Sequence, residues 1–573
     1  MKNIIIPPSA SGTRLTDWLA LHGQGISADC GGRGTCGKCR VKVVQGEFLR
    51  FGSGNEILEP DGNGMILACR AVCPAGGAVI LLPDTESEGL TSHAFSEMSG
   101  SGAQVAVGVQ DLSEREKQPA VELHGLSASE KQAAEPDGSP SLNVVWESAT
   151  PVISRGYGMA LDIGTTTIAA SLVDRASGKV VDSYSCLNPQ RSYGADVISR
   201  ITACREGRLD GLCRLIRQKT AEIISIFSDK HPDKYPQTLA VAGNTTMLHI
   251  LCGISPEPIG VWPFTPAFTK SLEFTGADLG LPVGRVIVLP SASAYIGADI
   301  TGGIFICGML NLDEPSLLVD IGTNGETVLF TGRSREGRLI AASSAAGPAL
   351  EGANISCGVG GIPGAVSSVA DIGWGRLGFS TIADRPPVGI CGSGLIGLVA
   401  VLLDAGRIDG SGYMDEGDFP LCGSPGASAV HIGSDGQTLR PGSFIPQIAL
   451  TQLDVREFQL AKGAIRAGID ALLSFTGLEI GEIGQVFVAG GLGYYMSIPA
   501  AIRTGLLPDA SPSNFRSVGN SSLAGAEAVL CKEDVLEEIS DIAARAEVVD
   551  LNTLPVFSDL FMRNMAFPEK NAE

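Results

Sequence analysis

Two aspartates occupy the same place in a pattern that occurs twice, and the residues around them suit a phosphate group and Mg²⁺. The segments GMALDIGTTTIAASLVD and SLLVDIGTNGETVLF each place an apolar run before an aspartate, Asp162 or Asp320, and a short polar turn after it. The turn residues either let backbone N–H groups approach an anion or offer it hydroxyl and amide groups: Gly164, Thr165, Thr166, Gly322, Thr323 and Asn324. Carboxylates are hard oxygen ligands for Mg²⁺, and repetition at a spacing of 158 residues predicts two homologous lobes that face one ligand.

A second group with a chemically informative spacing is a set of cysteines near the N-terminus. Five of the fourteen cysteines lie within the first 73 residues: Cys30, Cys36, Cys39, Cys69 and Cys73. The first three are separated by five and by two residues in a glycine-rich loop, and Cys69 follows after 29 more, which is close to the plant-type 2Fe–2S spacing. We therefore predict that Cys30, Cys36, Cys39 and Cys69 hold a 2Fe–2S cluster. The alternative is structural zinc, which usually needs two close cysteine or histidine pairs, and Cys73 leaves the fourth ligand open.

Composition restricts the class of protein. The 573 residues carry a formal net charge of −21 and form no basic patch, so we expect no nucleic-acid partner. The opening segment is interrupted by Pro7 and Pro8, and no early apolar run reaches the length of a signal sequence or a membrane span. We therefore expect a cytoplasmic protein with no membrane association. The nine other cysteines are mostly in apolar surroundings and are predicted core residues.

The N-terminal part and the segment after it differ in pattern. Residues 1–84 contain strand patterns at 3–6 and 40–44, a helix pattern at 16–22 and the cysteine loop, with only one strand before the helix. Residues 85–154 are rich in Ser, Glu, Gly and Ala and show no sustained periodicity. Such a composition cannot bury enough apolar surface to order itself, so we predict a flexible linker.

Beyond the linker, strand and helix patterns alternate to the end of the chain. We predict two lobes, residues 155–315 and 316–573, each with a mostly parallel α/β architecture. One strong helix is expected at 211–229, with five apolar residues on one face: Leu212, Leu215, Ile216, Ile223 and Ile224.

The duplicated aspartate loop resembles the two phosphate loops of the actin, sugar kinase and chaperone superfamily (ASKHA). That superfamily has a third element, a strand ending in two glycines beside adenosine, and QVFVAGGLG supplies Gly490 and Gly491 in the expected order. The resemblance implies two ribonuclease-H-like lobes that close on ATP and Mg²⁺, with Asp162 and Asp320 as the catalytic pair. The cysteine loop resembles that of 2Fe–2S ferredoxins, which implies an N-terminal β-grasp domain.

In combination these parts are similar to the reductive activators of corrinoid proteins. The resemblance rests on the ferredoxin-like start and on segments such as LNPQRSYGADVISRI, VAGNTTMLHIL, SSAAGPALEGANISCG and VREFQLAKGAIRAGI. It implies an ATP-dependent activator that returns a Co(II) corrinoid methyl-carrier protein to Co(I) by one-electron transfer from its 2Fe–2S cluster. It also implies a low-potential electron donor, such as reduced ferredoxin or flavodoxin, and it suggests a homodimer.

Other interpretations remain open. The chain could activate a different low-potential metalloenzyme, or it could be a metabolite kinase with a redox domain, although no catalytic base for a sugar or an acid is evident. The segment Ser343–Gly358, with Ser344, Ser356 and Cys357, is a candidate corrinoid-facing surface, and its alternative role is packing between the lobes. Glu326 is interpreted as a capping carboxylate rather than a catalytic one.

Overall fold

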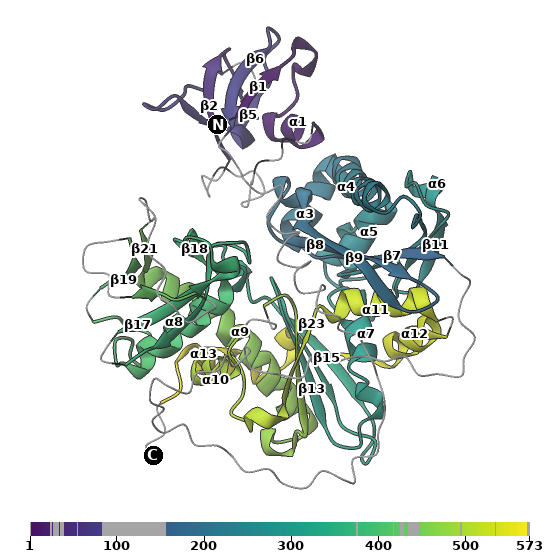
Figure 1. The fold of residues 1–573 in the computed structure, drawn as a ribbon, viewed down its shortest axis with the longest axis vertical. Helices are drawn as coiled ribbons and strands as arrows, with labels where there is room; N and C mark the ends of the chain where they lie inside the picture. Colours follow the sequence, from purple (N-terminus) through teal and green to yellow (C-terminus); the bar gives the residue numbers. More distant parts are fainter. Residues whose placement is uncertain are drawn as a thin grey trace.

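The structure is a computed structural model, and it describes most of the chain outside the predicted linker. The described residues are 2–22, 24, 26, 34, 39–53, 56–82, 156–373, 376–415, 417–423, 429–433, 447–492, 496–532 and 534–569. The predicted linker over 85–154 and the predicted ligands Cys30 and Cys36 lie outside these residues. Figure 1 shows an N-terminal domain, coloured purple, above two larger lobes.

The N-terminal domain is a small antiparallel sheet with one helix packed on it. Its strands, in spatial order, are β1 (Lys2–Ile6), β6 (Ala78–Leu82), β2 (Arg40–Gln45) and β4 (Met65–Leu67), and β3 (Leu49–Arg50) pairs separately with β5 (Ala71–Val72). Helix α1 (Leu15–Leu21) buries Leu15 and Leu19 against this sheet. A single strand, β1, precedes α1, as the sequence predicts, and β1 lies at the edge of the sheet.

The first lobe is built on a six-stranded sheet of mixed direction. In spatial order its strands are β11 (Leu272–Thr275), β12 (Arg285–Val288), β10 (Pro236–Gly243), β7 (Tyr157–Ile163), β8 (Thr167–Asp174) and β9 (Lys179–Leu187). Strand β10 pairs in parallel with β7 and β12, and the other three neighbouring pairs are antiparallel. The predicted mostly parallel sheet is therefore wrong for this lobe. Strands β7, β8 and β9 follow one another through short turns, and a short turn can only reverse the chain.

Helices cover the first sheet. They are α3 (Val197–Ala203), α4 (Leu209–Lys230), α5 (Thr245–Cys252) and α6 (Gly276–Leu279). In α4 all five apolar residues that the sequence places on one face are buried, which confirms that helix and its orientation.

The second lobe repeats the plan of the first around Asp320. Its six-stranded sheet runs β23 (Phe515–Gly519), β22 (Gln485–Ala489), β13 (Ser316–Ile321), β14 (Gly325–Phe330), β15 (Leu339–Ser344) and β24 (Glu547–Val548). As in the first lobe, the strand that carries the aspartate begins a three-stranded antiparallel meander and pairs in parallel on its other side. The predicted internal repeat is thus visible as a repeated topology.

A smaller unit is inserted in the second lobe between β15 and β22. It contains the four-stranded sheet β18 (Gly389–Ile390), β16 (Ala365–Asp371), β17 (Leu377–Thr381) and β20 (Val430–His431), and the pair β19 (Phe419–Cys422) and β21 (Ile448–Leu450). Its helices and those beside it are α8 (Gly392–Asp404), α9 (Gln452–Thr476), α10 (Ile498–Arg503) and α13 (Phe557–Met565). No helix in the described part of the chain is long and apolar enough to span a bilayer.

Helices α11 (Ser521–Cys531) and α7 (Ala298–Ile306) each pack against the lobe on the other side of the predicted boundary at 315/316. Helix α11, late in the sequence, packs against β7, β8 and β10 of the first lobe, and α12 (Val535–Arg545) follows it. Helix α7, early in the sequence, contributes Ile300 and Ile304 to the core of the second lobe. Helices α7 and α11 lie side by side (Figure 1), and a Cβ on Gly525 of α11 would stand 2.8 Å from Gly302 Cα of α7. Division of the chain at 315/316 stays a prediction, because the core of each lobe includes a helix from the other side of that point.

A buried lysine in α9 leads to a prediction on stability. Lys462 is 1% exposed, its Nζ donates to Ala566 O, and burial lowers its pKa from 10.5 to about 7. Between these two values the unfolded chain binds a proton that the folded chain does not, so the free energy of unfolding rises with pH, by at most about 1.4 kcal/mol per pH unit. From pH 7 to pH 9 we expect the melting temperature of the wild type to rise relative to that of Lys462→Met. Melting curves of both proteins that shift in parallel with pH would contradict this.

Candidate functional site

The two predicted phosphate loops meet across the interface between the lobes. The first loop follows β7 and the second follows β13. Thr166 Oγ1 of the first loop lies 3.4 Å from Thr323 Oγ1 of the second. Both hydroxyls also contact one carboxylate, that of Glu351. The tertiary structure therefore brings together the threonines that the sequence places 157 residues apart.

Asp162 is held by the crossing helix α11. Its carboxylate accepts hydrogen bonds from Asn520 Nδ2 at 2.9 Å and from Ser522 Oγ at 2.7 Å. Asn520 also caps α11, because its Oδ1 accepts from the Leu523 N–H. Burial raises the pKa of Asp162, and the two hydrogen bonds oppose that rise. Helix α11 thus fixes the position of Asp162, and the positive end of the helix dipole lies towards this carboxylate.

Asp320 lies at the end of β13 among other acidic groups. Burial and then the charges of Asp162 and Glu351 raise the pKa of Asp320 to about 7. The aspartates of the two loops are therefore close enough to repel each other. Such proximity is expected if both lobes face one ligand, as the sequence predicts.

Two further carboxylates belong to this group, and the sequence did not identify them as site residues. Asp299, in the first turn of α7, has its pKa raised to about 8 by burial and by the charges of Asp320 and Asp162. Glu326 pairs directly with Asp320 in the register of β13 and β14, and burial and the charge of Asp299 raise its pKa well above the usual range. The interpretation of Glu326 as a cap is wrong, because it lies inside a strand and accepts from Ser343 Oγ at 3.3 Å.

The chemistry of these donors fits Mg²⁺ with a phosphate ligand. Five carboxylates share the region, which leaves an excess of negative charge that a divalent cation would balance: Asp162, Asp299, Asp320, Glu326 and Glu351. Among the residues that the structure describes, no three such side chains are arranged to hold a metal ion directly. Mg²⁺ usually keeps several waters and takes one or two carboxylates together with substrate phosphates, so this arrangement suits it.

Polar side chains from the first lobe support the first phosphate loop. Asn188 Nδ2 donates to Gly164 O at 2.8 Å, and Asn244 Nδ2 donates to Thr165 Oγ1 at 3.0 Å. Arg200, which is 0% exposed, donates to Thr165 O, and burial lowers the pKa of its guanidinium to about 9. The segments LNPQRSYGADVISRI and VAGNTTMLHIL therefore hold the loop in shape, a role that the sequence did not reveal.

The two predicted adenosine glycines have different surroundings. Gly490 has φ +90°, and a Cβ there would lie 2.6 Å from Ile321 O and 2.8 Å from Asp320 Oδ1. A Cβ on Gly491 would meet no atom of the described residues within 4 Å. Gly490 is thus required by the packing of the second phosphate loop, and Gly491 leaves open space. Its role towards adenosine stays a prediction.

These surroundings predict different effects on stability for the same substitution at two neighbouring glycines. Gly490→Ala would place a side chain in the left-handed region, which costs at least about 1–2 kcal/mol, and would push on Asp320. We expect a lower melting temperature and weaker ATP binding. Gly491→Ala, the matched control, should leave stability within about 0.5 kcal/mol of wild type and weaken ATP binding several-fold. Thermal melting and calorimetric titration with Mg-ATP separate the two effects. Unchanged ATP affinity in Gly491→Ala would show that adenosine does not approach this backbone.

The described half of the predicted cluster site brings Cys39 and Cys69 together. Cys39 directly precedes β2, the Ala68 N–H donates to Cys39 O at 2.8 Å, and Cys69 follows in the next position. Both cysteines are 0% exposed. Arg14 Nε donates to Cys69 O at 2.7 Å and so holds that turn. Burial raises the pKa of the Cys73 thiol to about 11, so this thiol stays protonated. Two buried cysteines on neighbouring backbone segments fit two of the four cluster ligands, and Cys30 and Cys36 stay predictions.

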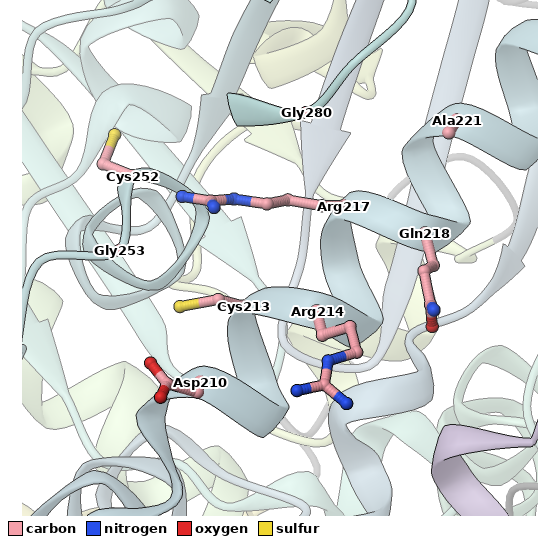
Figure 2. Close-up of a pocket in the computed structure, with 9 residues that line it drawn as sticks. All are labelled: Asp210, Cys213, Arg214, Arg217, Gln218, Ala221, Cys252, Gly253 and Gly280. Carbon is pink, nitrogen blue, oxygen red and sulfur yellow. The ribbon is translucent and has the colours of Figure 1, made fainter. Parts of the chain in front are cut away.

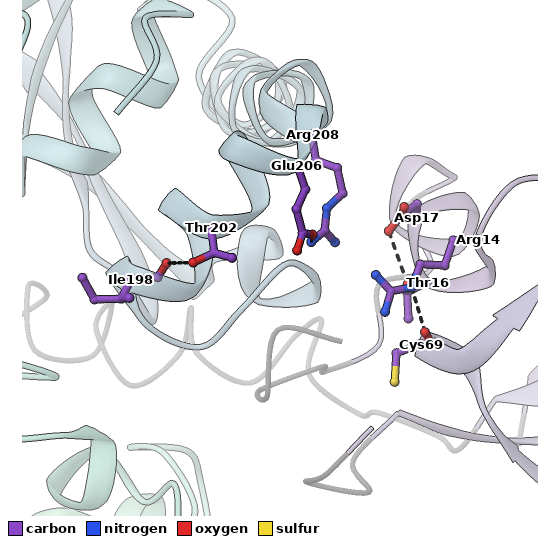
Figure 3. A network of polar contacts seen from close by, with 8 residues as sticks. All are labelled: Arg14, Thr16, Asp17, Cys69, Ile198, Thr202, Glu206 and Arg208. Atoms are coloured by element: carbon purple, nitrogen blue, oxygen red, sulfur yellow. Dashed lines mark hydrogen bonds and ion pairs between the residues drawn. The ribbon is translucent and has the colours of Figure 1, made fainter. Parts of the chain in front are cut away.

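The N-terminal domain contacts the first lobe through α1. Ala20 joins the apolar core of that lobe, and Asp17 faces Arg208 at the start of α4 (Figure 3). Burial raises the pKa of Asp17, and the charges of Arg14 and Arg208 oppose that rise. Arg14 therefore contributes both to the contact region and to the turn of Cys69.

A separate hollow lies on the outside of the first lobe. It has a volume of about 640 Å³ and is lined by α4 and by the turn after α5, with Arg214 and Arg217 among its residues (Figure 2). None of the predicted site residues that the structure describes lines it. This pocket is therefore distinct from the region where Thr166 and Thr323 approach each other.

The candidate corrinoid-facing segment is bonded within the second lobe at the three residues singled out. Ser344 Oγ donates to Gly325 O at 3.0 Å, and Cys357 Sγ donates to Ala449 O at 3.1 Å. The Ser356 N–H and Oγ donate to the Asp454 carboxylate at 2.7 and 2.6 Å. These contacts anchor the segment, and a corrinoid-facing role for it stays a prediction.

Comparisons with known proteins agree with this arrangement. Three family models match: a 2Fe–2S iron–sulfur cluster binding domain over residues 3–73, the RACo middle region over 157–312, and the C-terminal domain of RACo, the ASKHA domain, over 314–573. The chain is 32% identical over 426 residues to the corrinoid activation enzyme RamQ of Eubacterium limosum, which covers 72% of this chain and 70% of the relative. It is 28% identical over 306 residues to a Co(II) methylated amine-specific corrinoid protein reductase of Methanosarcina barkeri, covering 49% of this chain and 52% of that protein.

A solved structure is also similar over nearly its whole length. It is described as a reductive activator for corrinoid, iron–sulfur protein, with 29% sequence identity, a TM-score of 0.64 and coverage of 99% of both chains. Together with the family models, this similarity confirms the predicted fold, a ferredoxin-like domain followed by a two-lobed ASKHA unit.

Proposed function

The chain belongs to the family of reductive activators of corrinoid proteins, and from this premise we propose that it returns a Co(II) corrinoid methyl-carrier protein to Co(I) by ATP-dependent one-electron reduction. The observation that carries the ATP dependence is the approach of Thr166 and Thr323, from different lobes, beside Asp162 and Asp320. A site made from both lobes lets the nucleotide control how the lobes are arranged.

The need for ATP follows from the reduction potential. Plant-type 2Fe–2S clusters have reduction potentials of about −400 mV, and reduction of Co(II) to Co(I) requires an electron at a lower potential. For a one-electron step, each mismatch of about 59 mV costs a factor of ten in the equilibrium. ATP can offset such a mismatch only if the states before and after hydrolysis differ in their affinity for the Co(II) carrier.

The residues of the site have distinct roles in this proposal. Asp162 and Asp320 hold Mg²⁺ directly or through water, and one of them orients the attacking water. When bound, Mg²⁺ supplies positive charge against the charge that develops on the phosphate oxygens. The hydroxyls and backbone of the two loops bind the phosphates: Gly164, Thr165, Thr166, Gly322, Thr323 and Asn324. Gly490 shapes the second loop, and Gly491 leaves room for adenosine.

The redox part of the proposal rests on the N-terminal domain. Cys30, Cys36, Cys39 and Cys69 hold the 2Fe–2S cluster, which when bound accepts and gives up one electron. The electron comes from a low-potential donor such as reduced ferredoxin or flavodoxin. Action in the cytoplasm and as a homodimer is part of the same proposal.

The experiment follows the cobalt directly and without oxygen. Reduced protein is mixed with a Co(II) corrinoid carrier, and formation of Co(I) is followed by its absorbance with and without Mg-ATP. ATP-dependent appearance of Co(I) supports the proposal. If no candidate carrier yields Co(I) while the cluster is loaded and ATP is hydrolysed, the proposed reaction is wrong and another low-potential acceptor takes its place.

A further inference from the structure

The carboxylate of Glu351 stands between the two phosphate loops. Glu351 ends the short turn η7 (Pro348–Glu351) of the second lobe and is half-buried. Thr166 Oγ1 of the first lobe donates to Glu351 Oε2 at 2.8 Å, and Thr323 Oγ1 of the second lobe donates to the same oxygen. One carboxylate oxygen therefore receives a hydrogen bond from each lobe.

The surroundings of this carboxylate are those of an anion site. A Cβ on Gly322 would lie 4.0 Å from Glu351 Oε1, so the glycine of the second loop faces the carboxylate closely. Burial raises the pKa of Glu351, and the hydroxyls of Thr323 and Thr166 and the charges of Arg191 and Arg200 oppose that rise. Hydroxyl donors, a glycine and nearby guanidinium groups are also what a phosphate oxygen would bind.

Glu351 is firmly connected to the segment 343–358 around it. The preceding carbonyl, Leu350 O, packs against the start of α8, where a Cβ on Gly392 would stand only 1.9 Å from it. On the other side, Ser356 bonds twice to Asp454 at the start of α9. A displacement of Glu351 would therefore also displace the first residues of two helices of the second lobe, α8 and α9.

We propose that Glu351 competes with a nucleotide phosphate for the hydroxyls of Thr166 and Thr323, so that binding of ATP moves Glu351 and with it the segment 343–358. Glu351 is then the positioning residue through which occupancy of the site reaches the surface of the second lobe. The inference rests on the ATP dependence of the proposed function and names the residue that changes partner. ATP shifts the arrangement because two anions compete for one pair of donors.

The first test is the affinity for Mg-AMP-PNP, measured by calorimetry on the full chain. Removal of the competing carboxylate frees the hydroxyls of Thr166 and Thr323. Because hydrogen bonds to charged groups are strong, we expect Glu351→Ala to bind Mg-AMP-PNP at least about tenfold more tightly than the wild type. Glu351→Gln keeps the shape but not the charge and should lie between the two. The matched control is Glu457→Gln, because Glu457 is a carboxylate that accepts from Asn354 of the same segment at 3.4 Å, whereas Glu351 accepts from the two phosphate loops. Its affinity should equal that of wild type.

The second test is hydrogen exchange of the backbone over residues 343–358. In the wild type we expect exchange to rise when Mg-AMP-PNP is added. In Glu351→Ala we expect the raised exchange already without nucleotide. Equal or weaker binding of AMP-PNP by Glu351→Ala and Glu351→Gln, or exchange in the variants that matches wild type, would overturn the proposal.

The outcomes separate this inference from the proposed function. If the wild type binds no AMP-PNP, the ATP dependence itself is wrong and the role of Glu351 falls with it. If the wild type binds the nucleotide and forms Co(I) while the Glu351 variants bind it no more tightly, only the role of Glu351 is wrong.

Discussion

We expect replacement of Asp320 by asparagine to lower the proposed turnover of ATP at least about a hundredfold, because the site would lose a carboxylate that positions Mg²⁺ or the attacking water where charge develops. We expect the same substitution to make the metal-free protein more stable at pH 8. Burial and the neighbouring Asp162 and Glu351 raise the pKa of Asp320 from 3.8 to about 7. Between these values the folded chain binds a proton that the unfolded chain has released, so the free energy of unfolding of the wild type falls as pH rises. Asp320→Asn lacks this fall.

Three measurements test this result. ATP turnover is measured by phosphate release, and melting temperatures in the presence of a chelator are compared at pH 5 and pH 8. Asp541→Asn, in an exposed position of α12, is the matched control and should change neither quantity. Turnover within tenfold of wild type would remove Asp320 from the catalytic machinery. A lower melting temperature at pH 8 would show that Asp320 stabilises the fold instead of straining it.

We expect replacement of Cys39 or Cys69 by serine to abolish the 2Fe–2S absorbance and to lower the rate of the proposed Co(I) formation at least about a hundredfold, because thiolates are the ligands of such clusters. ATP binding should be unchanged, since the nucleotide loops lie in the two lobes. Visible absorbance and iron content report the cluster, and calorimetry with Mg-ATP reports the second site.

The control for this prediction is Cys73→Ala. Cys73 is 1% exposed in the core of the N-terminal domain, where burial raises the pKa of its thiol to about 11, and the predicted cluster spacing does not use it. Cys73→Ala is expected to keep the cluster and to lose only a little stability. A variant without cluster would make Cys73 the fourth ligand in place of Cys69.

The parts of the fold that local pattern encodes were predicted well. Helix α4 is an example, since its five apolar residues share one face at a spacing that only a helix brings together. The strand before each aspartate is another, because a short apolar run followed by a glycine turn is a local signal. The direction of the strands was not predicted correctly in the first lobe, since pairing depends on turn length and on partners distant in the chain.

The site itself was predicted only in part for the same reason. Asp299 has no repeated spacing or motif of its own, and Glu351 lies in the segment 343–358, which the sequence indicated only as a candidate corrinoid-facing surface and not as part of the phosphate site. Glu326 lies in the short strand GETVLF, whose pattern does not mark it as a site residue, and only the register of β13 and β14 places it opposite Asp320.

The sequence by itself determined which chemistry the chain carries: cysteines at cluster spacing, and two aspartate–glycine loops that each suit a phosphate. These signals are local, because a turn or a ligand loop is made by residues close together in the chain. Only the tertiary structure decided which residues share the site, because its contacts join distant positions. The bond from Asn520 to Asp162 spans 358 residues, and that from Thr166 to Glu351 spans 185. Such contacts arise when two lobes pack around crossing helices, and no local pattern records that packing.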